Sequence, residues 1–121
     1  DIPTGNPRNE RVVIEHIHEF MKLNFYSPDA QRYVFAVDPE VGINEGGGGP
    51  LNHQIMAALQ RQFPEHFKGV VSTDDFLASV SSFWVKRAGM KWWPMRVEHN
   101  PAWVIDDTLI DGDLMHVHRK P

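Results

Sequence analysis

The sequence Asp38-Pro-Glu-Val-Gly-Ile-Asn-Glu-Gly-Gly-Gly-Gly-Pro50 lies near the middle of the chain and contains two prolines and five glycines. Each proline removes a backbone donor and each glycine adds backbone freedom, so this stretch predicts a loop rather than a helix or strand. A loop of this length is uncommon in a compact domain and is typical of functional segments. We therefore expect it to separate two structured halves.

The segments on both sides of this loop have apolar residues at helical spacing, with charged residues between them. Prolines and capping residues mark where the expected helices begin and end. The pattern predicts four helices: one that follows Asn9, one from Pro28 to Val37, one from Pro50 to Phe63, and one from Ser72 to Arg87.

The helical period is lost from Met90 onward, where prolines interrupt aromatic and β-branched residues. Asp111-Gly112 separates the runs that begin at Trp103 and Leu114, and an Asp-Gly pair between two such runs is typical of a two-residue hairpin turn. We therefore expect a mainly α fold, in one domain over residues 1–121. It would consist of an irregular arm (1–8), a four-helix core (9–89) around a glycine-rich loop, and an extended aromatic arm ending in a β-hairpin (90–121).

Composition excludes several classes of function. The 12 Lys and Arg against 16 Asp and Glu give a formal charge of −4, which argues against a nucleic-acid grip made through phosphate contacts. No apolar run has the length of a membrane span, so we expect no membrane partner. The chain has no cysteine, which excludes disulfides and thiolate metal sites.

The tryptophans cluster between residues 84 and 103 and are accompanied by basic residues. Tryptophan and arginine are enriched where proteins meet, so this region predicts a contact surface for another protein chain or a second copy of this one. The basic residues have an alternative role, in which they cap a helix and cover an apolar seam. The expected partner-binding residues are Trp84, Trp92, Trp93, Arg96 and Trp103. The function predicted first is therefore a non-enzymatic interaction or assembly subunit.

A second function is implied by a resemblance. The segment Tyr26-Ser-Pro-Asp-Ala30, then Phe35-Ala36, Glu40, Gly47-Gly-Gly-Pro50 and Gln54 resembles the opening of phage-encoded lysozyme-like peptidoglycan-cleaving proteins. The resemblance covers residues 26–54 and implies a cell-wall glycoside hydrolase with Glu40 as its catalytic acid. Glu45 is the candidate partner carboxylate, because such hydrolases use paired carboxyl groups. The alternative is that both glutamates only solubilise the loop.

Two histidine patterns suggest metal sites. On a strand, His116 and His118 point to the same face, and a two-residue turn at Asp111-Gly112 sets His116 opposite Asp107. Two imidazoles and a carboxylate on one face predict a site for zinc or iron, although polar residues also protect a free sheet edge. Glu15 and His18 have the spacing of di-iron helix motifs, but no other expected helix carries the second motif that such a site needs.

Overall fold

The computed structural model describes residues 10–37, 49–86, 100–109 and 114–120. Within these ranges the chain forms three α-helices, one 3-10 turn and six strands. In chain order the elements are β1 (Val12–Ile14), α1 (Ile17–Tyr26), η1 (Ala30–Arg32), β2 (Tyr33–Val37), α2 (Gly49–Gln62), β3 (Val70–Ser72), α3 (Thr73–Ser79), β4 (Ser82–Lys86), β5 (Trp103–Leu109) and β6 (Leu114–Arg119).

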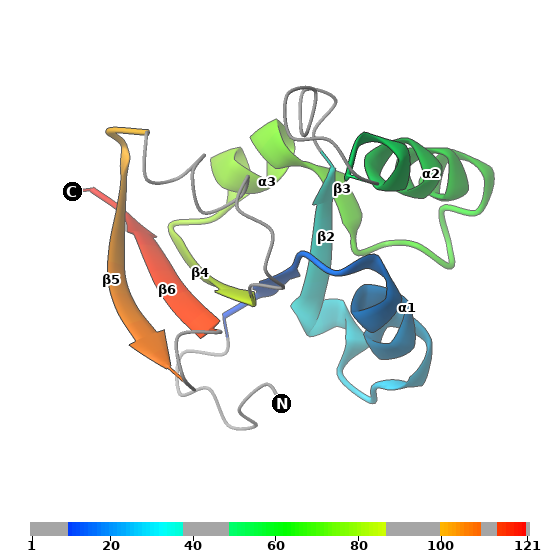
Figure 1. Ribbon diagram of the computed structural model, residues 1–121, viewed down its shortest axis with the longest axis horizontal. Coiled ribbons are helices and arrows are strands. Elements are labelled where there is room, and N and C mark those ends of the chain that lie inside the picture. The colour runs from blue at the N-terminus through cyan, green and yellow to red at the C-terminus, as the bar shows by residue number, and fades with distance from the viewer. Residues whose placement is uncertain (1–9, 38–48, 87–99, 110–113, 121) are drawn as a thin grey trace.

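The strands form one mixed sheet in the order β3-β2-β1-β4-β6-β5. Strands β3, β2, β1 and β4 are parallel, whereas β6 pairs antiparallel with both β4 and β5. Helices connect the parallel strands, and Figure 1 shows the β5–β6 hairpin at the far edge from α1 and α2. The fold is therefore α/β, and the expected mainly α four-helix domain is wrong.

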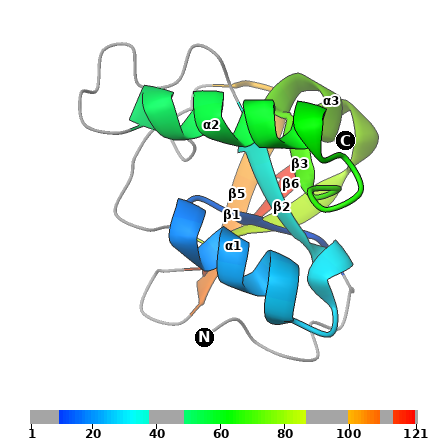
Figure 2. The ribbon, with the colours of Figure 1, turned by 90° about the vertical axis from the view of Figure 1, so that its right-hand side faces the viewer.

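Helices cover both faces of the sheet. Phe20 of α1 and Met56 of α2 pack in one buried cluster with Val12 and Ile14, while Phe76 of α3 packs in another with Val13. Figure 2 shows α1 and α2 side by side in front of the sheet, with α3 behind it. Crossovers between parallel strands are right-handed as a rule, so helices come to lie on opposite faces when the chain moves one way from β1 to β3 and then returns across the sheet to β4.

Both faces of the central strands are consequently buried. Val12, Val13 and Ile14 are each at most 1% exposed, and β2 is buried over Tyr33–Ala36. Parallel strands covered on both faces consist of nearly continuous apolar, β-branched and aromatic residues. The runs Val-Val-Ile, Tyr-Val-Phe-Ala-Val and Ser-Phe-Trp-Val-Lys have this composition.

Three expected helices are corrected by these strands. Residues 12–14, which were assigned to the first helix, form β1, and α1 begins only at Ile17. The expected second helix is β2, and the expected fourth helix ends at Ser79, before β4. A short, fully buried apolar run has no periodicity that separates a strand from a helix, which explains the error.

Other expectations agree with the structure. Helix α2 covers Gly49–Gln62, close to the expected third helix, and the Ser72 side chain accepts a hydrogen bond from the Asp75 backbone at 3.1 Å, as an N-cap does. β5 and β6 pair antiparallel, as the hairpin prediction requires. The glycine-rich loop and the turn at 110–113 lie outside the described residues.

Candidate functional site

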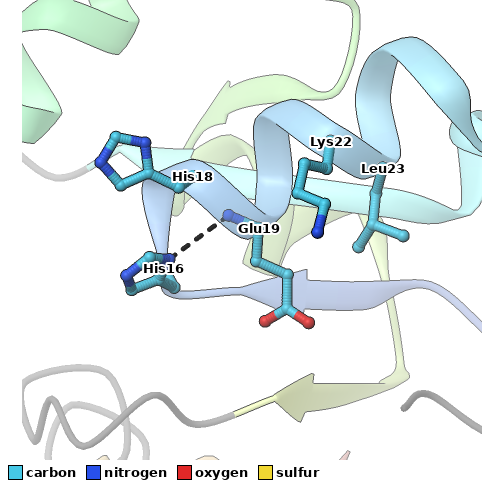
Figure 3. Close-up of a pocket in the computed structure, with 5 residues that line it drawn as sticks. All are labelled: His16, His18, Glu19, Lys22 and Leu23. Carbon is cyan, nitrogen blue, oxygen red and sulfur yellow. Dashed lines mark hydrogen bonds between the residues drawn. The ribbon is translucent and has the colours of Figure 1, made fainter.

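A pocket of about 430 Å³ lies beside the start of α1, where the chain leaves the carboxyl end of β1. Its volume falls in the range of small-molecule sites, which is roughly 300–1,000 Å³. The described residues that line it are His16, His18, Glu19, Lys22 and Leu23. They all come from the first seven residues of α1 and the residue before it, and Figure 3 shows them together.

His16 fixes the beginning of α1. It is the N-cap residue, with an extended backbone, and its Nδ1 accepts a hydrogen bond from the backbone N–H of Glu19 at 3.3 Å. An imidazole nitrogen that accepts a hydrogen bond carries no proton, so the neutral His16 ring has its proton on Nε2. The exposed ring of His16 therefore offers a hydrogen-bond donor at its second nitrogen.

An ion pair joins the helix to the sheet beside this pocket. The ammonium of Lys86 contacts the carboxylate of Glu19, and both side chains are partly buried. Lys86 is the last residue of β4 and is opposite Ile14, the last residue of β1, in the ladder. The pair therefore crosses the carboxyl ends of the two neighbouring strands and neutralises the Glu19 charge locally.

The pocket lies at a position in the sheet that is relevant to ligand binding. The chain order of the parallel strands runs outward from β1 to β2 and β3, and then resumes at β4 on the other side of β1. Open α/β sheets bind ligands outside the carboxyl ends of their strands at such a reversal of strand order. The pocket lies at the carboxyl end of β1, next to the Glu19–Lys86 pair.

A second polar cluster lies at the opposite, amino end of β1 and β4. The carboxylate of Glu10 is 2.8 Å from Nε2 of His116, and it also accepts a hydrogen bond from the Ser82 hydroxyl. The side chains of Glu10 and His116 are 9% and 2% exposed, and the His116 ring packs 4.7 Å from the Trp84 ring. Burial also lowers the pKa of the adjacent Arg11 guanidinium. This cluster is enclosed, so we assign it a role in stability rather than in binding.

The hairpin metal site stays a prediction. The ladder sets His116 opposite Asp107, which confirms the expected register. The Asp107 side chain lies outside the part of the chain whose side chains are described, and the carboxylate bound to His116 is that of Glu10. His118 is partly buried. Among the described residues, no group of three or more His, Asp or Glu side chains is arranged to hold a metal ion.

The expected partner-binding residues are only partly described. Trp84 and Trp103 are 9% and 6% exposed, in opposite core clusters, so neither presents an indole on the surface of this chain. Trp92, Trp93 and Arg96 lie outside the described residues, as do Glu40 and Glu45. The interaction surface and the hydrolase site therefore stay predictions.

The pocket residues were largely missed from the sequence. Glu15 and His18 were paired as a di-iron motif on one helix, but Glu15 precedes α1 and is buried after β1. His16 and Lys22 were not singled out. The sequence did contain a signal for this site. A buried β-branched run followed directly by polar residues and a helix is the pattern expected at the carboxyl end of a ligand-binding strand.

Comparisons with protein-family models, curated proteins and solved structures found no match to this chain. Across the described segments, no helix combines the length and the hydropathy that crossing a bilayer requires.

Proposed function

We propose that this protein binds a small molecule in the pocket formed by His16, His18, Glu19, Lys22 and Leu23. The observation that carries the proposal is the position of this pocket beside the carboxyl end of β1, where the order of the parallel strands reverses. Ligand sites of open α/β sheets occur at this position because helix starts and strand ends converge there.

The lining of the pocket supports this proposal. Small-molecule sites combine apolar surface with a few polar groups that orient the ligand. Leu23 supplies an apolar wall, His16 supplies a hydrogen-bond donor from the N-cap position, and Lys22 supplies an ammonium from α1. The Glu19–Lys86 pair holds the start of this helix against β4, which keeps the polar groups in a fixed position.

The fold alone does not define the ligand. Dinucleotide-binding sheets of this strand order have a glycine-rich fingerprint directly after the first strand, where the backbone approaches a pyrophosphate. Here β1 is followed by Glu15-His16-Ile17-His18-Glu19, which contains no glycine. We therefore exclude that mode of nucleotide binding at β1.

A screen of small molecules by two-dimensional amide NMR tests the proposal. We expect binders that shift the backbone signals of residues 16–23. His18→Trp adds an indole to the exposed lining and should weaken binding about tenfold, which corresponds to roughly 1.4 kcal/mol. His66→Trp is the matched control, because His66 is an exposed histidine outside the pocket lining.

Two results would contradict the proposal. One is a screen in which no compound perturbs residues 16–23. The other is a set of binders whose affinities are the same for wild type and His18→Trp, since these would occupy another surface.

A further inference from the structure

The charged side chains around the pocket differ in whether an opposite charge contacts them. Glu19 is the only carboxylate among the described lining residues, and the Lys86 ammonium contacts it directly. The Glu19 carboxylate is therefore already paired with the Lys86 ammonium before a ligand binds. Because it is balanced by Lys86, it contributes little net field to the pocket.

Among the described residues, Lys22 has no such partner. Its ammonium lines the pocket from an exposed position, and no carboxylate of the described residues forms an ion pair with it. An ammonium has three donors and no acceptor, so a ligand group that contacts it must accept hydrogen bonds. Lys22 is one helical turn from Glu19, and Figure 3 shows both side chains extending to the same side of α1.

His16 adds a second donor to the lining of the pocket. Its Nδ1 is used by the Glu19 backbone, so its Nε2–H is the group that remains for a ligand. A donor and a cation that line one pocket match the oxygens of an anionic group, because hydrogen bonds to an ionised acceptor are stronger than neutral ones.

We infer that the ligand of this pocket carries a carboxylate or phosphate group that binds the Lys22 ammonium, and that the His16 Nε2–H is a second donor in the same lining. This inference rests on the proposed function, since it names the chemical class that the same pocket takes. Lys86 adds little net charge to the pocket in this scheme, because the Glu19 carboxylate balances its ammonium.

The test is an amide NMR titration of the full chain with inorganic phosphate, sodium acetate and tetramethylammonium chloride, at constant ionic strength. We expect one or both anions to shift residues 16–23 saturably and the cation to give no saturable shift there. Saturable shifts with phosphate alone would indicate a phosphate group in the ligand, and saturable shifts with acetate would indicate a carboxylate.

Three variants connect the binding to the named charges. Lys22→Met should weaken anion binding about fivefold or more, and Lys22→Arg should retain most of it because the charge is kept. Glu19→Gln should strengthen binding, because the glutamine oxygen can still accept a hydrogen bond from Lys86 while the negative charge that balanced the ammonium is removed. Lys68→Met is the control, since Lys68 is an exposed lysine that pairs with Glu65 outside the pocket.

The inference is overturned if neither anion saturates, if Lys22→Met binds the anion as tightly as wild type does, or if Glu19→Gln weakens binding. Neutral or cationic compounds that bind at residues 16–23 while both anions fail would overturn this inference and leave the proposed function intact. A pocket that binds nothing would overturn both.

Discussion

Gly69 occupies a position where the packing leaves no room for a side chain. It lies directly before β3, and its carbonyl accepts a hydrogen bond from Phe35 of β2 at 2.9 Å. A Cβ atom built on Gly69 would be 2.6 Å from the Tyr33 carbonyl oxygen and 3.3 Å from the Phe20 ring. The Tyr33 oxygen belongs to a buried strand and cannot move aside alone. Forcing a methyl group into this site therefore separates β2 from its neighbour.

We predict that Gly69→Ala lowers the free energy of unfolding by about 1–3 kcal/mol, as overpacking of a core does. Urea denaturation followed by circular dichroism measures this change. The adjacent Lys68→Ala is the control, because its side chain is 76% exposed and should change stability by less than about 0.5 kcal/mol. A Gly69→Ala protein as stable as the control would contradict the close approach of the two strands.

The buried contact between Glu10 and His116 gives a second prediction for single residues. His116→Ala leaves a buried carboxylate without one of its two described partners and should cost about 3 kcal/mol. Glu10→Ala should also destabilise the protein, but the double variant should cost less than the sum, because the pair interacts directly. A double-mutant cycle by urea denaturation measures the coupling. Strictly additive costs would show that the two side chains do not interact.

This pair also shows what the sequence could predict for individual side chains. The position of His116 opposite Asp107 followed from the Asp-Gly turn, because hairpin register is a local property. Glu10 was not predicted, because it lies 106 residues away in the chain and meets His116 only after β1, β4 and β6 assemble. No local pattern encodes a contact of that separation.

For the helices, the clearest prediction concerns the start of α3. Ser72→Ala removes the side-chain oxygen that accepts the Asp75 N–H, and loss of such a cap costs about 1 kcal/mol. Thermal unfolding followed by circular dichroism measures the loss as a lower melting temperature. Ser81→Ala is the matched control, since Ser81 is exposed and lies outside the helix. Equal melting temperatures for the two variants would argue against the cap.

At the scale of helices and strands, features marked by local capping, stop or turn residues were predicted correctly. Strands whose conformation depends on burial in the sheet were missed. The Ser72 cap, the stop of α2 before Pro64 and the β5–β6 pairing all have local signals, and the structure has all three. Strand β2 has no such local signal, because its residues are apolar on both faces. Its strand conformation comes from pairing with β1 and β3, which is a property of the assembled sheet.

For the molecule as a whole, the position of the pocket depends on one topological feature. The pocket has a special position only because β1 lies between β2 and β4 and ends beside Lys86. If residues 10–25 formed one amphipathic helix, as their apolar spacing suggested, His16 would lie in mid-helix and the strand ends would not exist. The run of polar residues after β1 was a local signal, but the position of the pocket follows from the sheet order, which no local pattern encodes.

The most direct test is therefore a nuclear Overhauser measurement on the isotopically labelled chain. The structure predicts contacts between backbone protons of β1 and β4 for the pairs Val12–Trp84, Val13–Val85 and Ile14–Lys86. It also predicts strong sequential amide–amide contacts that begin only at Ile17. An unbroken series of sequential amide contacts from residue 10 to residue 25, without contacts to residues 84–86, would contradict the sheet order and the pocket derived from it.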